Sequence, residues 1–546
     1  MNWGWLLVVG VCLLPGWPAL AQSAPAAGSS VWVPDLGNGT FKNPVLYADY
    51  SDPDAIRVGD DFYLVSSSFN AVPGLPILHS KDLVNWSLIG AVFDKQPPLA
   101  RYAVPQHGNG VWAPAIRYHN KEFYIYYPDP DLGIFVTKAK HPAGPWSTPV
   151  CLKEAQGWID PCPLWDEDGR AYLVHGFAGS RAGIKTILAV SPMSADGLSL
   201  TGPDALVFDG HQGHPTLEGP KFYKRKGYYY IFAPAGGVPT GWQLVLRSKN
   251  VFGPYEERIV MDQGQTPING PHQGAWVDTN TGEDWFLHFQ DQYAYGRVVH
   301  LQPMVWKNDW PVIGEDADGD GKGQPVQTYR KPRVKGRAQP LATPPTSDEF
   351  STNQLGRQWQ WHANPQDYWA FLNGPQGYLR LYAMPLAEGY KNLWQQPNLL
   401  LQKLPAETFT VTTKLRFDSR REGEKLGLLM MGLDYAYLGL INQGGKLQLR
   451  LSTCKDADKG TAETSTAPVE VPAAQARQPI YLRVAVQPGA LCQFSYSFDG
   501  QTFQPVGAEF KAREGKWIGA KVGLFCTRPG PFNDSGNADI DWFRIE

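Results

Sequence analysis

The sequence of 546 residues has no excess of charge of one sign, because 49 basic residues face 52 acidic ones and the net charge is −3. Without surplus lysine and arginine to neutralise phosphates, nucleic acid is excluded as the main partner. Charged residues make up only 18% of the chain and aromatic residues 13%. This composition indicates a folded protein rather than an intrinsically disordered one.

Long hydrophobic runs are also lacking, with one short exception at the N-terminus. The apolar run at residues 5–14 is too short to span a bilayer and precedes Ala19-Leu20-Ala21, a small-x-small cleavage pattern. We predict a signal peptide over residues 1–21 and export of the rest of the chain to the periplasm or the cell exterior. A retained anchor is the alternative. No later segment approaches 18 apolar residues, so a soluble mature protein without a membrane span is expected.

Cysteines are few, six in the whole chain, and their spacings fit no zinc motif. Five remain after residue 21, an odd number, so at least one thiol must be unpaired. One disulfide remains possible, either Cys151–Cys162 or a pair in the C-terminal part. The sequence also lacks a phosphate-binding G-x-x-x-x-G-K-[ST] loop, a G-x-S-x-G nucleophile turn and a sialidase S-x-D-x-G-x-T-W box.

A five-fold repeat fills the first two-thirds of the chain. A small polar or acidic lead, an apolar strand, a polar turn and an aromatic strand recur from residues 51, 111, 159, 217 and 271. A further strand pattern follows in each unit, so each unit holds about four short strands. Five such units predict an all-β, five-bladed β-propeller. Tandem sandwiches would need repeats of about 100 residues, roughly twice the observed length.

In a propeller the first strand of every blade lines a central channel, so the lead residues of the repeats should meet on one axis. These leads are Asp52, the pair Val111 and Trp112, Asp160, Glu218 and His272. Burying three carboxylates together is costly unless they are paired or protonated. Glycoside hydrolysis needs such a set: an acid protonates the leaving oxygen and a carboxylate activates water. A third carboxylate can keep the acid protonated.

The same segments resemble glycoside hydrolase family 43. They are NPVLYADYSDPDAIRVGDDFYLVSSSF, VWAPAIRYHNKEFYIYY, IDPCPLWDEDGRAYLV, LEGPKFYKRKGYYYIF, NGPHQGAW and YGRVVHLQP, in the family's order over roughly residues 40–335. The resemblance implies a five-bladed propeller that acts with inversion, mostly on β-xylosides and α-L-arabinofuranosides.

The resemblance implies three catalytic roles: Asp52 as general base, Glu218 as general acid, and Asp160 as the carboxylate that tunes and orients the acid. One triplet departs from the family, since Asp54 stands where a serine is usual. Side chains two residues apart on an extended chain point to the same face, so spacing alone does not choose between Asp52 and Asp54 as base. An aspartate before proline can also be a plain turn residue.

Four further residues are implied to contact substrate. By the resemblance, Arg297 holds a sugar hydroxyl, Trp112 and Phe69 form walls of the first sugar subsite, and His272 lies near a water or calcium ion at the channel centre. Each has a structural alternative: the arginine could pair with a carboxylate, and the other three could belong to the blade core.

No cofactor is expected to be required for the chemistry, but a structural calcium ion is possible near the axis or at the loop DADGDGKG that starts at Asp316. This loop resembles the start of a calcium site, yet Gln327 stands where the bidentate glutamate should be. A surface turn is therefore the favoured interpretation.

A Pro-rich, basic run over residues 331–347 separates the repeats from a different pattern. We predict a propeller over 22–335, a linker over 336–347 and a β-sandwich over 348–546, because short strands alternate with turns and no helical period appears. The last part resembles the lectin-like jelly roll that follows the propeller in many family 43 xylosidases. It could close one end of the active site or serve as a carbohydrate-binding module.

The leading hypothesis is an inverting exo-glycosidase that releases terminal β-D-xylose from xylo-oligosaccharides or xylan-derived glycans. An α-L-arabinofuranosidase with the same catalytic residues is one alternative, and a non-catalytic carbohydrate-binding propeller is another. The sequence does not decide between exo and endo cleavage or give the oligomeric state.

Overall fold

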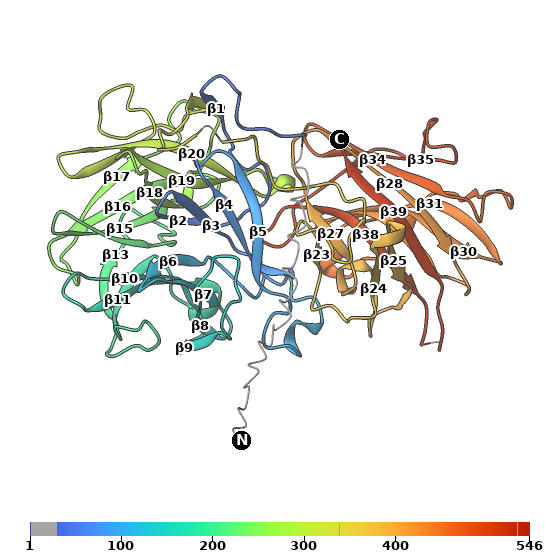
Figure 1. Ribbon diagram of the computed structural model, residues 1–546, viewed down its shortest axis with the longest axis horizontal. Coiled ribbons are helices and arrows are strands. Elements are labelled where there is room, and N and C mark those ends of the chain that lie inside the picture. The colour runs from blue at the N-terminus through green and yellow to red at the C-terminus, as the bar shows by residue number, and fades with distance from the viewer. Residues whose placement is uncertain (2–29, 338, 532) are drawn as a thin grey trace.

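The structure, a computed structural model, describes residues 30–337, 339–531 and 533–546 together with Met1. Residues 2–21 of the predicted signal peptide lie outside the described residues. The described chain folds into two β domains that lie side by side, coloured blue to yellow and orange to red in Figure 1. Within the described part of the chain, no helix is long and apolar enough to cross a membrane.

The first domain is the predicted propeller, with five four-stranded antiparallel sheets in chain order. Blade 1 contains β2 (Asp54–Val58), β3 (Asp61–Val65), β4 (Gly74–Ser80) and β5 (Trp86–Phe93). Blade 2 contains β6 (Ala115–His119), β7 (Glu122–Asp129), β8 (Gly133–Ala139) and β9 (Val150–Glu154). Blade 3 contains β10 (Trp158–Trp165), β11 (Ala171–Phe177), β12 (Ile187–Met193) and β13 (Ala205–Asp209). Blade 4 contains β14 (Lys221–Arg225), β15 (Tyr228–Ala235), β16 (Trp242–Ser248) and β17 (Glu256–Met261). Blade 5 contains β18 (His272–Asp278), β19 (Asp284–Asp291), β20 (Arg297–Lys307) and β21 (Trp310–Ile313).

Helical structure is minor: α1 (Gly179–Ala182) and the 3-10 turns η1 (Arg101–Ala103), η2 (Tyr293–Tyr295), η3 (Gly374–Gln376), η4 (Leu393–Gln395) and η5 (Ala457–Lys459). The polar turns of the repeat do connect hairpins. In blade 4, for example, Lys226 and Gly227 both have positive φ (48° and 76°) between β14 and β15, which is the conformation of a two-residue type I′ turn.

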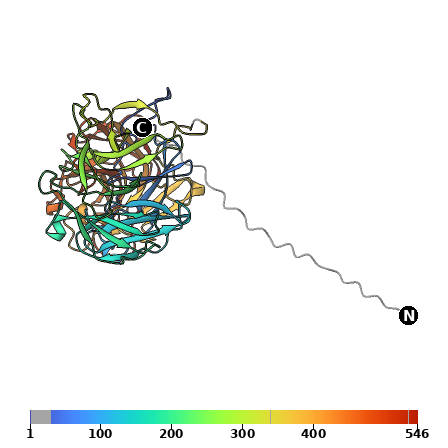
Figure 2. The ribbon, with the colours of Figure 1, turned by 90° about the vertical axis from the view of Figure 1, so that its left-hand side faces the viewer.

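The ring is closed by the chain ends of the domain. β1 (Thr40–Lys42) pairs with β22 (Thr328–Arg330), and Leu46 forms a bridge with Val299 in blade 5. The first strands of neighbouring blades contact one another around the axis. The lead residues of the repeat are therefore gathered at one end of the channel. Figure 2 looks onto this domain with the second domain behind it.

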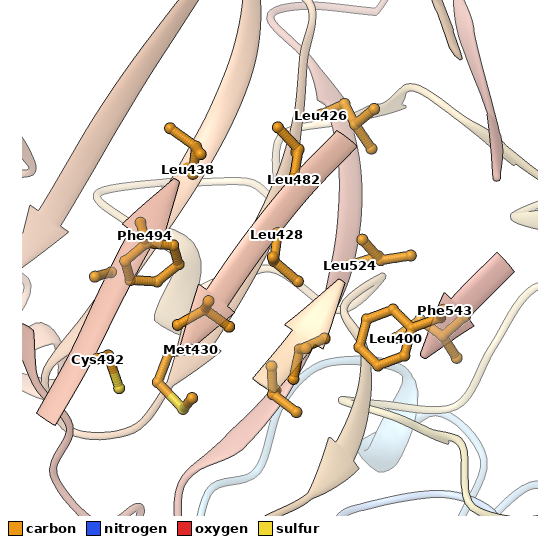
Figure 3. Close-up of a cluster of buried hydrophobic side chains, with 14 of the residues drawn as sticks. Leu400, Leu426, Leu428, Met430, Leu438, Leu482, Cys492, Phe494, Leu524 and Phe543 are labelled. Carbon is orange, nitrogen blue, oxygen red and sulfur yellow. The ribbon is translucent and has the colours of Figure 1, made fainter. Parts of the chain in front are cut away.

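The second domain is the predicted β-sandwich. One sheet runs in the order β23 (Gln360–Trp361), β27 (Leu400–Lys403), β38 (Lys521–Arg528), β29 (Lys425–Met431), β30 (Tyr435–Gln443), β31 (Lys446–Cys454) and β32 (Thr464–Ser465), with β26 (Met384–Pro385) and β33 (Val469–Glu470) beside it. The other runs β24 (Ala370–Asn373), β25 (Tyr378–Tyr382), β39 (Asn537–Ile545), β28 (Phe409–Asp418), β34 (Ile480–Gln487), β35 (Leu491–Ser497) and β36 (Gln504–Pro505), with β37 (Phe510–Lys511) beside β35. Alternate residues of both sheets, such as Leu428, Leu482, Phe494 and Leu524, meet in the core (Figure 3).

The boundary between the domains is short. β22 ends at Arg330, and Asp348 already forms a bridge with Phe543 of β39 in the sandwich. The sandwich is joined to blade 1 by a bridge between Trp361 and Val72. The two domains thus share a continuous hydrogen-bonded interface.

The structure contains none of the disulfides considered from the sequence, because all five described cysteines are free. Cys151 lies on β9, the outermost strand of blade 2, whereas Cys162 lies on β10, the innermost strand of blade 3. Residues close in sequence are thus placed on opposite edges of neighbouring sheets. Cys454, Cys492 and Cys526 lie on three different strands of the sandwich.

Candidate active site

Three predicted carboxylates come from three blades, each at or just before the start of an innermost strand. Asp52 precedes β2, Asp160 is near the start of β10, and Glu218 precedes β14. Asp160 and Asp52 are buried, whereas 28% of the Glu218 side chain is exposed. Glu218 is therefore the carboxylate with most access to a ligand in the channel.

Asp52 and Asp160 share an unusual backbone conformation. Their φ angles are 53° and 56°, a left-handed region that costs roughly 1–2 kcal/mol for a residue other than glycine. Such strain is retained at functional sites when the surrounding structure enforces it. The same strain at equivalent positions of two blades turns both carboxylates toward the axis ahead of their strands.

Asp52 is surrounded by hydrogen-bond donors. The Ser67 hydroxyl donates to Oδ2 at 2.6 Å and the Ser51 hydroxyl at 3.0 Å, while Nη1 of Arg297 donates to Oδ1 at 2.8 Å. These donors fix the orientation of the carboxylate, as a general base requires.

The structure separates Asp54 from this group. Its Oδ2 accepts hydrogen bonds from the Ile116 backbone N–H at 2.8 Å and from Arg117 at 2.7 Å, both in blade 2. Asp54 is completely buried and joins two blades, whereas Asp52 faces Arg297 and the axis.

Asp160 has a raised pKa. Burial is the main cause and the nearby charge of Glu218 the second, whereas the Gly219 backbone N–H that donates to Oδ2 at 2.7 Å lowers it. Lys221, fully buried in β14, also favours the ionised form. Asp160 therefore keeps a proton to a higher pH than a solvated aspartate does, and it is tied to the residue that follows Glu218.

Glu218 is held from two sides. Nε2 of His272 in blade 5 lies 2.9 Å from its Oε1, and its backbone N–H donates to the Pro234 carbonyl at 3.2 Å. A side chain on Gly219, which has φ 61°, would come within 2.8 Å of the Gln273 side chain. The EGP sequence thus requires glycine so that blades 4 and 5 can approach closely.

Arg297 stands at the start of β20 and points to the same axis. Burial lowers its pKa, but the charges of Asp52, Asp291 and Asp49 outweigh this and raise it. Its backbone N–H donates to Oδ1 of Asp49 at 2.9 Å. The guanidinium is therefore fixed beside the proposed base, where it can also donate to a hydroxyl of a bound sugar.

The predicted subsite residues Phe69 and Trp112 belong to an aromatic cluster. Phe69 and Trp112 lie edge to face with centroids 6.5 Å apart, and Trp112 is the more exposed of the two. Trp517, from the sandwich, meets the other side of Trp112 at 6.4 Å and is 49% exposed. The two residues predicted to form a subsite wall thus lie in one aromatic cluster with a residue from the second domain.

Sequence reasoning missed Trp517, Ser51, Ser67 and the contacts that fix Arg297 from the sandwich. Oδ2 of Asp49 accepts the Gly519 backbone N–H at 3.0 Å, and the Asp49 carbonyl accepts a hydrogen bond from Lys403. Ser67 follows strand β3 and Ser51 directly precedes Asp52, so their positions in the repeat could have identified them. The sandwich contacts leave no signal in the sequence, because they join segments hundreds of residues apart.

Among the described residues, only Asp316, Asp318 and Asp320 form a group of three side chains close enough to hold a metal ion. Lys307 and Lys322 already pair with this group, at 2.9 Å from Asp316 and 3.2 Å from Asp320. At the axis, the Nδ1 atom of the buried His272 has no hydrogen-bond partner among the described residues.

Known families, relatives and solved structures match this chain along most of its length. A family profile described as Glycosyl hydrolases family 43 matches residues 41–311, and one described as Beta xylosidase C-terminal Concanavalin A-like domain matches residues 347–546. A putative beta-xylosidase from Xylanibacter ruminicola is 40% identical over 90% of this chain and 87% of its own length. A non-reducing end alpha-L-arabinofuranosidase from Bacteroides ovatus is 29% identical over 93% and 95%. The crystal structure of a xylan beta-1,4-xylosidase from Bacillus halodurans superposes with a TM-score of 0.80 at 25% identity, over 92% of this chain and 99% of the other.

Proposed function

The chain belongs to glycoside hydrolase family 43, and from that premise we propose that it releases terminal β-D-xylose from xylo-oligosaccharides or xylan-derived glycans with inversion. The observation that carries the proposal is the convergence of Asp52, Asp160 and Glu218 from three blades onto one axis beside Arg297. Similarity to proteins named beta-xylosidase supports xylose as the sugar.

In this proposal Asp52 accepts a proton from the attacking water while Glu218 donates one to the glycosidic oxygen. The three donors on Asp52 hold it in a fixed orientation for the water. His272 orients the Glu218 carboxyl, and Asp160, which accepts the backbone N–H of Gly219 at 2.7 Å, fixes the segment that carries the acid and is electrostatically coupled to it. Arg297 donates to a hydroxyl of the sugar in the first subsite.

The wall formed by Trp112, Phe69 and Trp517 supports exo cleavage. The sandwich loop at residues 513–519 packs against the propeller, where a side chain on Gly108 would come within 2.9 Å of Trp517. A channel narrowed in this way favours a chain end over the middle of a polymer.

An α-L-arabinofuranosidase is the second candidate, because a relative similar along nearly the whole chain is named for that activity. The catalytic residues would keep the same roles. A non-catalytic sugar-binding propeller is disfavoured, since none of the three carboxylates is missing and each faces the axis.

The chemistry proposed here uses no cofactor. A calcium ion at the loop of Asp316, Asp318 and Asp320 would be structural, because this loop follows the last blade strand and holds none of the catalytic residues. We also propose export, from the N-terminal pattern ending in Ala21. N-terminal sequencing of the protein recovered outside the cytoplasm should begin at Gln22, and an intact Met1 would contradict export by cleavage.

The deciding experiment measures nitrophenol release by the purified protein from an aryl β-D-xylopyranoside and an aryl α-L-arabinofuranoside side by side. A higher kcat/KM for the xyloside is expected. A higher value for the arabinofuranoside would favour the second candidate, and activity on neither would contradict both. Proton NMR of the first sugar released should show the α-anomer of xylose, as inversion of a β-xyloside requires.

A further inference from the structure

A large groove lies at the junction of the two domains. It has a volume of about 1160 Å³ and runs between η2 of blade 5 and the sandwich. On the sandwich side, the ends of β31 and β32 from one sheet and β37 from the other line the groove. None of the catalytic side chains described above belongs to it.

The groove begins next to the sugar-binding arginine. Asp291, at the end of β19, is the direct cross-strand partner of Arg297 in β20. Oδ1 of Asp291 accepts the backbone N–H of Tyr293 at 3.0 Å, and Tyr293 lines the groove. Four residues of chain span at most about 14 Å, so Tyr293 lies within reach of an oligosaccharide whose first sugar is held by Arg297.

The side chain of Tyr293 is exposed on the wall of the groove. It is 75% exposed, and its φ of 50° is a strained conformation for a residue other than glycine. Its neighbour Tyr295 is anchored in the sandwich, where its hydroxyl group contacts the Glu407 carbonyl at 2.9 Å and accepts the Ala490 N–H at 2.8 Å. A solvent-facing tyrosine ring on an anchored backbone provides a flat apolar surface with a polar tip.

The opposite wall presents hydroxyl groups. Thr453 and Thr464 lie side by side across β31 and β32 with their Oγ1 atoms 3.0 Å apart. Charges of both signs line the groove, Lys455 and Lys511 against Glu509 and Glu514, so neither an anion nor a cation is favoured. An aromatic platform facing hydroxyl groups and mixed charges suits a neutral oligosaccharide.

We propose that this groove binds the leaving-group part of the substrate chain, beyond the sugar next to the scissile bond. The occupant is a segment of xylo-oligosaccharide continuous with the chain end held at Arg297. This inference rests on the proposed function, because the xylan chain is its ligand. It predicts that the enzyme distinguishes substrates by chain length as well as by terminal sugar.

The test compares kcat/KM for xylotetraose with kcat/KM for an aryl β-D-xyloside, which has no sugar beyond the scissile bond. In Tyr293→Ala the ratio should fall about fivefold, the value of one aromatic contact, and Tyr293→Phe should restore it. Tyr368→Ala, which removes an exposed tyrosine outside the groove, should leave the ratio unchanged. The ratio does not depend on the fraction of folded enzyme, so an unchanged ratio in Tyr293→Ala would overturn the proposal.

Binding without hydrolysis separates this inference from the proposed function. Calorimetric titration of Glu218→Gln with xylotetraose should show an affinity about fivefold higher than that of the double variant Glu218→Gln, Tyr293→Ala. Equal affinities, or no binding of xylotetraose to either, would overturn the groove assignment. Tyr293-dependent binding by a protein that hydrolyses no xyloside would instead keep the groove and refute the proposed activity.

Discussion

The proposed mechanism assigns Glu218 as general acid and Asp52 as general base. Substrates with good and poor leaving groups can distinguish these two roles. Glu218→Gln removes the donated proton but keeps the size of the side chain and an acceptor for His272, 2.9 Å away. General acid catalysis contributes about 10²–10⁴-fold to rate. We expect a loss of that size in kcat/KM on xylobiose, whose leaving group is a sugar hydroxyl. Dinitrophenyl β-D-xyloside needs little protonation, so the loss on it should be much smaller.

Asp52→Asn should behave differently, because every substrate needs a deprotonated water. The loss should be about 10²–10⁴-fold on both xylobiose and the dinitrophenyl xyloside. The amide still accepts from Arg297, which donates to Oδ1 at 2.8 Å, so the fold should be preserved. Steady-state kinetics on both substrates, with circular dichroism and thermal unfolding on each variant, provides the measurement.

A matched control lies two residues away. Asp54→Asn weakens the contact with Arg117, whose side chain is largely buried, and breaking a buried ion pair costs about 3–5 kcal/mol of stability. Its effect should therefore be on the free energy of unfolding rather than on the ratio between the two substrates. Equal losses on both substrates for Glu218→Gln, or a selective loss for Asp52→Asn, would refute the assignment of acid and base.

Three other outcomes follow from the charges in the structure. Burial, and then the charge of Glu218, raise the pKa of Asp160 to about 7, so above that pH Asp160→Asn removes a negative charge next to Glu218. The basic limb of the pH profile of kcat/KM on xylobiose should therefore move to lower pH, and an unmoved limb would contradict the tuning role. Burial, and then the neighbouring Lys403, lower the pKa of Lys521 to about 7 from 10.5. Between pH 7 and 10 the unfolded chain thus binds a proton that the folded chain does not, and the free energy of unfolding should rise with pH. Lys521→Met should reduce this rise, to which the buried Lys403 also contributes, and add about 1–4 kcal/mol at pH 7, as measured by denaturant titration. Chelation of calcium, if it acts at the loop of Asp316, should lower the thermal midpoint without changing kcat.

The repeat in the sequence was sufficient to predict the propeller, for a simple physical reason. A blade is one meander of four strands, so its turns and aromatic strands leave a local pattern at a fixed spacing, and the lead residues inherit equivalent places on the axis. The same regularity did not show which of Asp52 and Asp54 is the general base, because the two residues share a face of an ideal strand. The choice became visible only because φ at Asp52 is positive, which breaks that regularity.

Contacts between the domains left no such pattern. Lys403 and Gly519 reach Asp49 across 354 and 470 residues of sequence, and neither belongs to a repeat. The Cys151–Cys162 disulfide is the opposite case. The two cysteines are close in sequence, but the boundary between blades 2 and 3 separates them. Where two sheets meet, residues far apart in sequence can therefore be in contact, and residues close in sequence can be far apart in space.

The interface next to Asp49 is hard to explain by stability alone. Lys403 and Lys521 are direct cross-strand neighbours in β27 and β38, and like charges in that position repel. One carboxylate, Asp49, lies near both, and its two oxygens accept the backbone N–H groups of Arg297 and Gly519. Buried charges of this kind stabilise less than apolar residues of the same volume would. They do connect the sandwich to the arginine that holds the proposed base. The sandwich is therefore best understood as a part of the active site.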